Sequence, residues 1–315
     1  MTPFPSPYHR PVFQIVELNP YAPRQYVFSE AALCLRDSIR LAGYTCSLRN
    51  NEADPRGISI IFGAWQFGRA MVEALDRQRT IVFNLEQLGA TDAFPGKPYE
   101  DWLRERIVFD YHASNIERLA PSPGERSRVF EVPIVPASSL ATDGPEPSSP
   151  EVDVLFFGSQ SPRREEIVRR LRAAGLTVDW VGGGACAPAY GVALAPAMMR
   201  SRIILNVHFY QTRLAPSTRM LQAAVRGVPI VSETSVQTGS CDWSQSGVVF
   251  ADYDDIVAAC RALIDSPVRR LQSVQRTLHF VARLEFAIAF EEAITALGFT
   301  TAYDTGHLAS RNLFS

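Results

Sequence analysis

The sequence predicts an α/β protein with two Rossmann-like domains, each built on a parallel sheet, that face each other across a cleft. Its 315 residues exceed one typical domain of about 150 residues. Short β-branched runs alternate with helical patterns in both halves. Residues 136–150, PASSLATDGPEPSSP, hold too few large apolar side chains to fold alone and separate the halves. We expect an N-terminal domain over 1–140, a linker over 141–150, a C-terminal domain over 151–298 and a tail over 299–315.

In the first half, short apolar runs predict strands at residues 12–18, 58–62, 80–84, 106–110 and 129–133. The runs at 58–62 and 80–84 are continuously apolar, which is typical of strands buried on both faces of a parallel sheet. Helices are expected at 29–42, with Ser29 as N-cap, and at 114–119.

In the second half, strands are expected at residues 152–157, 178–181, 203–207, 229–232 and 248–250. Apolar residues at helical spacing predict helices at 163–174, 218–226, 256–264 and 284–297. Ligands of parallel sheets bind at the carboxyl ends of the strands and, with two domains, in the cleft between them. Candidate site residues should therefore follow strands.

Composition excludes several classes of protein. Lys and Arg number 31 against 33 Asp and Glu, so the net charge of −2 favours neither nucleic acid nor anionic membranes as partners. Lys97 is the only lysine, so any side-chain cation that binds phosphate must be an arginine. The five cysteines are widely spaced without a metal-binding pattern, which favours a reducing cytoplasm and no metal. Neither a signal peptide nor an 18-residue apolar span is expected.

The first candidate site is the turn GSQSPRR after the strand at 152–157. Small residues such as Gly158 and Ser159 let a phosphate approach the free N–H groups of a helix N-terminus. Arg163 and Arg164 oppose the helix dipole there, and a bound anion would relieve that conflict. A plain turn with solvated arginines is the equally weighted alternative.

The second candidate is Ser217-Thr218-Arg219. Ser217 or Thr218 can cap the next helix, and the free N–H groups with Arg219 would suit a diphosphate. His208 ends an apolar strand, where a structural histidine is more common than a catalytic one. The run at 182–184 lacks the spacing of a dinucleotide fingerprint.

In the first half, Asn84, Glu86 and Gln87 directly follow a strand, where an acceptor would bind. Glu86 could act as a general base. Glu30, which opens the first long helix, and Trp65, which could stack on a sugar ring, complete the acceptor-side candidates. Taken singly, each is more often structural. The sequence has no GxSxG, P-loop or HExxH motif, so hydrolase and kinase readings are unsupported.

Several segments resemble GT-B glycosyltransferases, in particular the group-1-like families that include CgeB-like proteins. In the second half these are VDVLFFGSQSPRREEIVRRLRAAG, MMRSRIILNVHFY and STRMLQAAVRGVPIVSE, and in the first half IVFNLEQL and FDYHASNIERL. The resemblance implies a glycosyltransferase that moves a sugar from a nucleoside-diphosphate sugar, without a metal or other cofactor, to a glycan, lipid-linked glycan, protein or small molecule. It also implies that the last helix or the tail packs onto the first domain.

The resemblance places the donor pyrophosphate against Gly158, Ser159, Thr218 and Arg219, with Arg163 or Arg164 as further charge. Retaining members often carry two glutamates where this sequence has Leu214 and Gln222. Gln222 could instead bind a ribose hydroxyl, and Glu233 follows the next strand. The resemblance also favours His208 as a catalytic or donor-binding residue, because related sequences place a histidine after the same strand.

Three alternatives stay open at this stage. The missing glutamates allow a catalytically silent module that binds a sugar nucleotide or partners an active transferase. A nucleotide-sugar epimerase would use the same two-domain cleft, and an NAD enzyme is the most distant reading because the glycine fingerprint is absent. Peripheral membrane contact and a homodimer are both compatible with the sequence.

Overall fold

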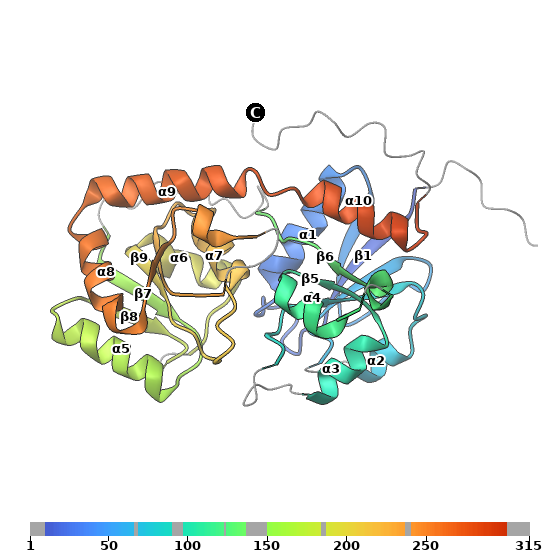
Figure 1. Cartoon of the computed structure of the whole chain (residues 1–315), viewed down its shortest axis with the longest axis horizontal. Helices are drawn as coiled ribbons and strands as arrows, with labels where there is room; N and C mark the ends of the chain where they lie inside the picture. Colours follow the sequence, from blue (N-terminus) through green and yellow to red (C-terminus); the bar gives the residue numbers. More distant parts are fainter. Residues whose placement is uncertain are drawn as a thin grey trace, which may run out of the picture.

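The computed structural model shows two α/β domains side by side, each a parallel sheet covered by helices (Figure 1). It describes residues 10–65, 69–89, 97–122, 124–136, 150–183, 187–236 and 241–300. Most of the predicted linker and nearly all of the predicted tail lie outside these residues.

The first sheet has six parallel strands in the order β2-β1-β3-β4-β5-β6. The strands are β1 (Val12–Glu17), β2 (Thr45–Asn50), β3 (Ile58–Phe62), β4 (Thr80–Asn84), β5 (Ile107–Asp110) and β6 (Val129–Glu131). The helices are α1 (Ser29–Leu41), α2 (Arg69–Glu73), α3 (Lys97–Arg104) and α4 (Ala113–Leu119). Sequence analysis missed β2, because this partly exposed edge strand lacks a continuous apolar run.

The second sheet has five parallel strands in the order β11-β10-β9-β7-β8. The strands are β7 (Val152–Phe157), β8 (Val178–Val181), β9 (Ser201–Asn206), β10 (Ile230–Glu233) and β11 (Val249–Ala251). The helices are α5 (Pro162–Ala173), α6 (Ala195–Met199), α7 (Ser217–Ala224), α8 (Ile256–Ile264), α9 (Pro267–Val281) and α10 (Phe286–Ala296). The predicted α/β class with parallel sheets is confirmed.

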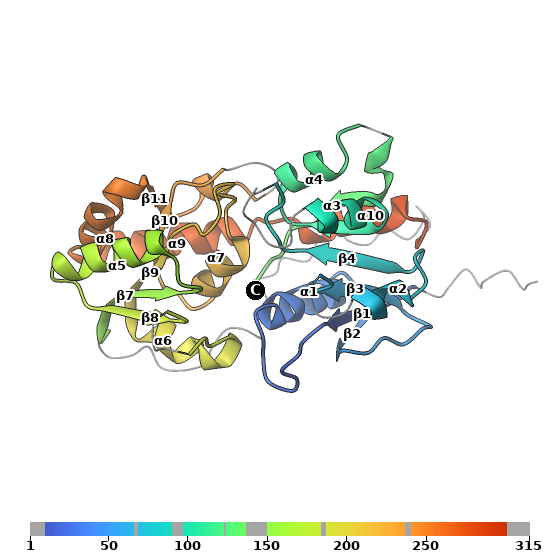
Figure 2. The same cartoon turned by 90° about the horizontal axis from the view of Figure 1, so that it is seen from below.

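The order of the strands reverses at β7: β8 lies on one side of β7, and β9 and the later strands lie on the other, with all strands still parallel. Such a switch point opens a crevice at the carboxyl ends of the strands, where ligands of doubly wound sheets bind. The carboxyl ends of both sheets point toward the junction of the two domains (Figure 2). The fold therefore directs the loops after β4, β7 and β9 to one region.

Helix α10 follows the second domain in sequence but packs on the first (Figure 1). The Tyr44 hydroxyl donates to Glu291 at 2.7 Å, and the Phe290 ring lies 5.2 Å from the Phe13 ring. The expected boundary at residue 298 thus assigns α10 to the wrong domain. The resemblance had implied this return of the last helix, which the local apolar pattern cannot reveal.

Both predicted serine caps are wrong. Ser29 is already the first helical residue of α1, and its hydroxyl donates to the buried Glu17 carboxylate at 2.6 Å. Neither Ser217 nor Thr218 caps α7, whose N-cap is Pro216. The Ser217 hydroxyl instead accepts from the Trp243 indole N–H at 3.0 Å. Tertiary hydrogen bonds have taken the hydroxyls that local sequence would assign to helix ends.

Candidate donor site between the domains

A cavity of about 500 Å³ lies at the carboxyl ends of β7 and β8 and reaches Val27 of the first domain. The predicted donor residues that line it are Gly158, Ser159, Arg164, Thr218, Arg219 and Gln222. They come from the loop after β7 and from helices α5 and α7, which are far apart in the sequence. The structure thus brings the two independently predicted anion sites into one cavity.

Gly158 permits the close approach of two cations to the turn after β7. It has a φ of 127°, a value that side chains disfavour. A Cβ there would lie 3.1 Å from an Arg219 nitrogen and 3.3 Å from an Arg164 nitrogen. Gly182, at the end of β8, packs against the Gly158 carbonyl and also lines the cavity. Of the glycine run at 182–184, Gly182 therefore shapes the cavity wall, and residue 184 lies outside the described residues.

Arg164 and Arg219 are held by uncharged groups. Arg164 donates to the Val207 carbonyl at 2.7 Å, and Arg219 donates to Asn206 Oδ1 at 2.5 Å while its guanidinium lies over the Phe157 ring. Neither arginine forms an ion pair with a carboxylate in the part of the chain that the structure describes.

Burial lowers the pKa of both guanidinium groups, and the charge of Arg164 lowers that of Arg219 further. Two partly desolvated cations with no counterion are stabilised by a bound anion. Guanidinium groups match phosphate oxygens especially well, because their N–H donors form a planar fork. The chemistry of the cavity therefore suits a phosphate-bearing ligand.

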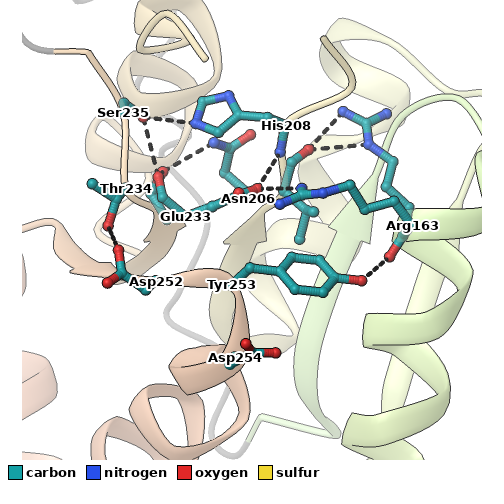
Figure 3. A network of polar contacts seen from close by, with 12 residues as sticks. Arg163, Asn206, His208, Glu233, Thr234, Ser235, Asp252, Tyr253 and Asp254 are labelled. Atoms are coloured by element: carbon teal, nitrogen blue, oxygen red, sulfur yellow. Dashed lines mark hydrogen bonds and ion pairs between the residues drawn. The ribbon is translucent and has the colours of Figure 1, made fainter. Parts of the chain in front are cut away.

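Arg163 and Glu233 do not line this cavity, contrary to expectation. The Arg163 guanidinium pairs with the buried Glu233 carboxylate through Nη1 and Oε2 at 2.6 Å, and it lies 4.0 Å above the Tyr253 ring. The Tyr253 hydroxyl donates to the Arg163 carbonyl at 2.7 Å (Figure 3). The helix-dipole conflict predicted for Arg163 is thus relieved by a carboxylate of the protein itself.

His208 belongs to the same polar network and is likewise absent from the cavity lining. Its backbone N–H donates to Glu233 at 3.1 Å, and its Nε2 lies 3.0 Å from the Ser235 hydroxyl (Figure 3). Burial lowers the pKa of His208 to about 4, so the imidazole is neutral at pH 7. His208 holds the loop whose next two residues, Phe209 and Tyr210, do line the cavity.

Glu86, an acceptor-side candidate, is also absent from the cavity lining. It lies just after β4, and its carboxylate accepts from the Trp65 indole N–H at 3.2 Å. Burial raises the pKa of Glu86 to about 7, which suits a general base near neutral pH. Trp65 thus orients a carboxyl group, a role that its sequence position did not reveal.

The remaining acceptor-side candidates are structural. Asn84 is fully buried and donates to Asp110 at 2.6 Å. Gln87 crosses to the second domain, where it accepts from the Thr212 hydroxyl at 2.7 Å and donates to the Leu214 carbonyl at 3.3 Å. Both are committed to internal or interdomain contacts.

Glu30 forms a buried ion pair at 2.5 Å with Arg226, which lies in the turn after α7. The pair joins the first helix of the N-terminal domain to the end of the helix that carries Arg219. Glu30 therefore holds the two domains together and does not contribute to an acceptor surface.

Sequence analysis missed the aromatic side chains of the cavity, which are Phe157, Tyr190, Phe209 and Tyr210. Phe209 and Tyr210 follow directly after a strand, a signal that could have found them. Tyr190 lies in a loop with no such signal, and only the fold places it in the cavity. Within the described ranges no three metal-ligating side chains cluster, and no helix is long and apolar enough to cross a membrane.

Residues 162–286 match the family described as "Glycosyl transferase-like". Two uncharacterized proteins of Acanthamoeba polyphaga mimivirus are similar to the chain. One is 31% identical over 109 residues, which cover 34% of this chain and 12% of the relative. The other is 23% identical over 210 residues, which cover 64% of each. The chain thus spans less than two thirds of the length of these relatives.

Several solved structures share the fold at 11 to 12% identity. TarM of S. aureus has a TM-score of 0.56, with 85% of this chain and 58% of TarM covered. T4 phage BGT in complex with UDP and Mn²⁺ has a TM-score of 0.55, with 90% of this chain and 99% of BGT covered. An α-glucosyltransferase, AGT, in complex with UDP has a TM-score of 0.53, with 91% of this chain and 99% of AGT covered. The chain is therefore a GT-B fold protein whose second domain carries a glycosyl transferase-like segment.

Proposed function

We propose that the chain is a glycosyltransferase that moves a sugar from a nucleoside-diphosphate sugar to an acceptor hydroxyl. The observation that carries this proposal is the pair Arg164 and Arg219, which meet without a carboxylate partner in the cavity at the switch point of the second sheet. The match to the glycosyl transferase-like family and the UDP complexes of similar folds support the same reading.

In this proposal Arg164 and Arg219 bind the diphosphate, and Ser159 and Thr218 add polar contacts to it. Gln222 is available to a ribose hydroxyl. Glu86 takes the proton of the acceptor hydroxyl as its oxygen bonds to the anomeric carbon. The bond from that carbon to the diphosphate oxygen breaks, and the nucleoside diphosphate leaves with the electron pair. The two guanidinium groups stabilise its developing charge, the task that a metal would otherwise perform.

Replacing Arg219 tests the diphosphate site. Arg219→Ala removes a charged hydrogen-bond donor worth about 2 kcal/mol, so nucleotide affinity should fall roughly 30-fold. Thermal shifts with UDP, GDP, dTDP, CDP, ADP and NAD, with and without EDTA, measure this loss. Arg163→Ala is the matched control, because this neighbouring arginine is paired with Glu233 and should leave affinity unchanged. Equal nucleotide shifts for the parent and Arg219→Ala would refute the site.

Product analysis with the donor that this panel identifies separates the alternatives. Leu214 occupies a position where a glutamate is common in retaining relatives, and its side chain is buried, which motivates the silent-module reading. Tight donor binding with neither transfer nor hydrolysis would favour that reading over the enzyme. An isomerised donor with no released nucleoside diphosphate would identify an epimerase.

For peripheral membrane contact we propose the exposed face of α9. Its Val268 and Leu271 are 65% and 59% exposed, and the exposed Arg269 and Arg276 of the same helix form no ion pair within the described ranges. Apolar and arginine side chains together suit an anionic lipid surface. The chain should co-sediment with vesicles that contain phosphatidylserine, and Leu271→Glu should abolish this. The exposed Val192 offers the control Val192→Glu, and sedimentation unchanged by Leu271→Glu would refute the surface.

A further inference from the structure

We infer that Asn84, Asp110 and Asn115 form a clamp that positions Glu86 for proton transfer. The inference rests on the proposed role of Glu86 as the general base. None of the three side chains lines the donor cavity. They are positioning residues, which act through Glu86.

The two asparagines hold the loop after β4 at both ends. The Glu86 carbonyl accepts from Asn84 Nδ2 at 3.0 Å and from Asn115 Nδ2 at 2.9 Å. The Glu86 N–H donates to Asn84 Oδ1 at 3.2 Å, and the Leu88 N–H donates to Asn115 Oδ1 at 3.1 Å. The backbone on either side of the Glu86 side chain is thus fixed by side chains from β4 and α4.

Asp110 at the end of β5 fixes the asparagines in turn. Its carboxylate accepts from Asn84 Nδ2 at 2.6 Å, from Asn115 Nδ2 at 3.0 Å and from the His112 N–H at 2.9 Å. Asp110 is fully buried and forms no ion pair with any residue that the structure describes. Burial of a carboxylate without an ion-pair partner costs free energy of folding, and these hydrogen-bond donors offset that cost.

Every amide hydrogen of the clamp has an acceptor. Each Nδ2 group has two hydrogens, and in both asparagines one points to Asp110 and the other to the Glu86 carbonyl. Loss of one member would leave buried polar groups of the others unpaired, so the arrangement holds as a unit. Since Trp65 also holds the Glu86 carboxylate, both the backbone and the side chain of the base are fixed.

The test compares two amide replacements of similar size in the same domain. Asn115→Leu removes the clamp. Gln14→Met removes a buried amide of β1 that bonds the Asp54 carbonyl at 2.6 Å and the Ser59 hydroxyl at 3.0 Å. Misplacement of a catalytic group by about 1 Å costs on the order of 100-fold in rate. We expect kcat for donor hydrolysis to fall on that order in Asn115→Leu, with KM and nucleotide shifts unchanged, and to stay within about twofold in Gln14→Met.

A double-variant cycle distinguishes positioning from loss of fold. In the Glu86→Gln background, Asn115→Leu should lower kcat no further, because the group that it positions is already gone. A full further loss there would overturn the inference. Asn115→Ser replaces Asn115→Leu if the latter does not fold.

If the parent shows no turnover, the proposed function fails, and hydrogen exchange still tests the clamp. Amides of residues 86–88 should exchange faster in Asn115→Leu than in Gln14→Met. Equal exchange in the two variants would overturn the clamp itself.

Discussion

Glu86→Gln is expected to slow sugar transfer, to an acceptor or to water, by about 10²- to 10⁴-fold, the usual contribution of a general base. The amide keeps the size of the side chain. Its oxygen can still accept a hydrogen bond from the Trp65 indole N–H, which now lies 3.2 Å from Glu86 Oε1. It cannot take up the acceptor proton. Release of nucleoside diphosphate from the donor identified by thermal shift measures the loss.

Glu73→Gln is the matched control. Glu73 lies in the same domain and also accepts from an indole, that of Trp102, at 3.2 Å. Helix α2, which carries Glu73, lies on the side of the first domain away from the second (Figure 1). Glu73→Gln should leave turnover within about twofold of the parent. Equal turnover in Glu86→Gln and the parent would remove Glu86 from the chemistry.

The pH dependence of both activity and stability follows from Glu86. Its pKa of about 7 means that turnover should rise with pH through 7, as the carboxyl group becomes the active base. The folded pKa lies above the unfolded value of about 4.3, so its contribution to stability is full below pH 4 and is lost as pH rises through 7. Glu86→Gln should therefore gain stability relative to the parent between pH 5 and 8, as measured by urea unfolding.

Arg226→Met is expected to destabilise the protein by about 3–5 kcal/mol, the cost of leaving one charge of a buried ion pair without its partner. Glu30 is 4% exposed, and Arg226 supplies the ion-pair contact to its carboxylate, at 2.5 Å. Since this pair connects α1 to the turn after α7, its loss also loosens the junction of the domains beside the donor cavity. Urea unfolding at pH 7 measures the change in free energy.

The double variant Glu30→Leu with Arg226→Met should recover most of that loss. The pair is incompletely satisfied, because Glu30 Oε2 and Arg226 Nε are buried without hydrogen-bond partners. Apolar replacement of such a pair is often neutral or stabilising. Arg56→Met, which breaks the exposed pair with Asp54, should cost less than about 1 kcal/mol. A loss that small in Arg226→Met would contradict the prediction.

Much of the fold was predictable because continuous apolar runs identify buried strands. The predictions at residues 58–62 and 80–84 coincide with β3 and β4, which are buried along their whole length. Sequence analysis missed α9, because its exposed face mixes valine and leucine with arginine and so obscures the helical period. The predicted domain boundary at residue 298 also placed α10 in the wrong domain, since an apolar helix face fits either sheet and only the resemblance implied its return to the first domain.

The sequence by itself determined the parallel α/β class, and it predicted two anion-binding turns and arginine as the side chain that would contact phosphate. Only the tertiary structure decided which arginine faces the cavity. Arg163 and Arg164 are adjacent in sequence, but successive residues of a helix point about 100° apart. One therefore meets Glu233, 70 residues away, and the other meets the Val207 carbonyl at the cavity. Side-chain direction and distant partners, which the fold alone supplies, separate a structural ion pair from a candidate binding site.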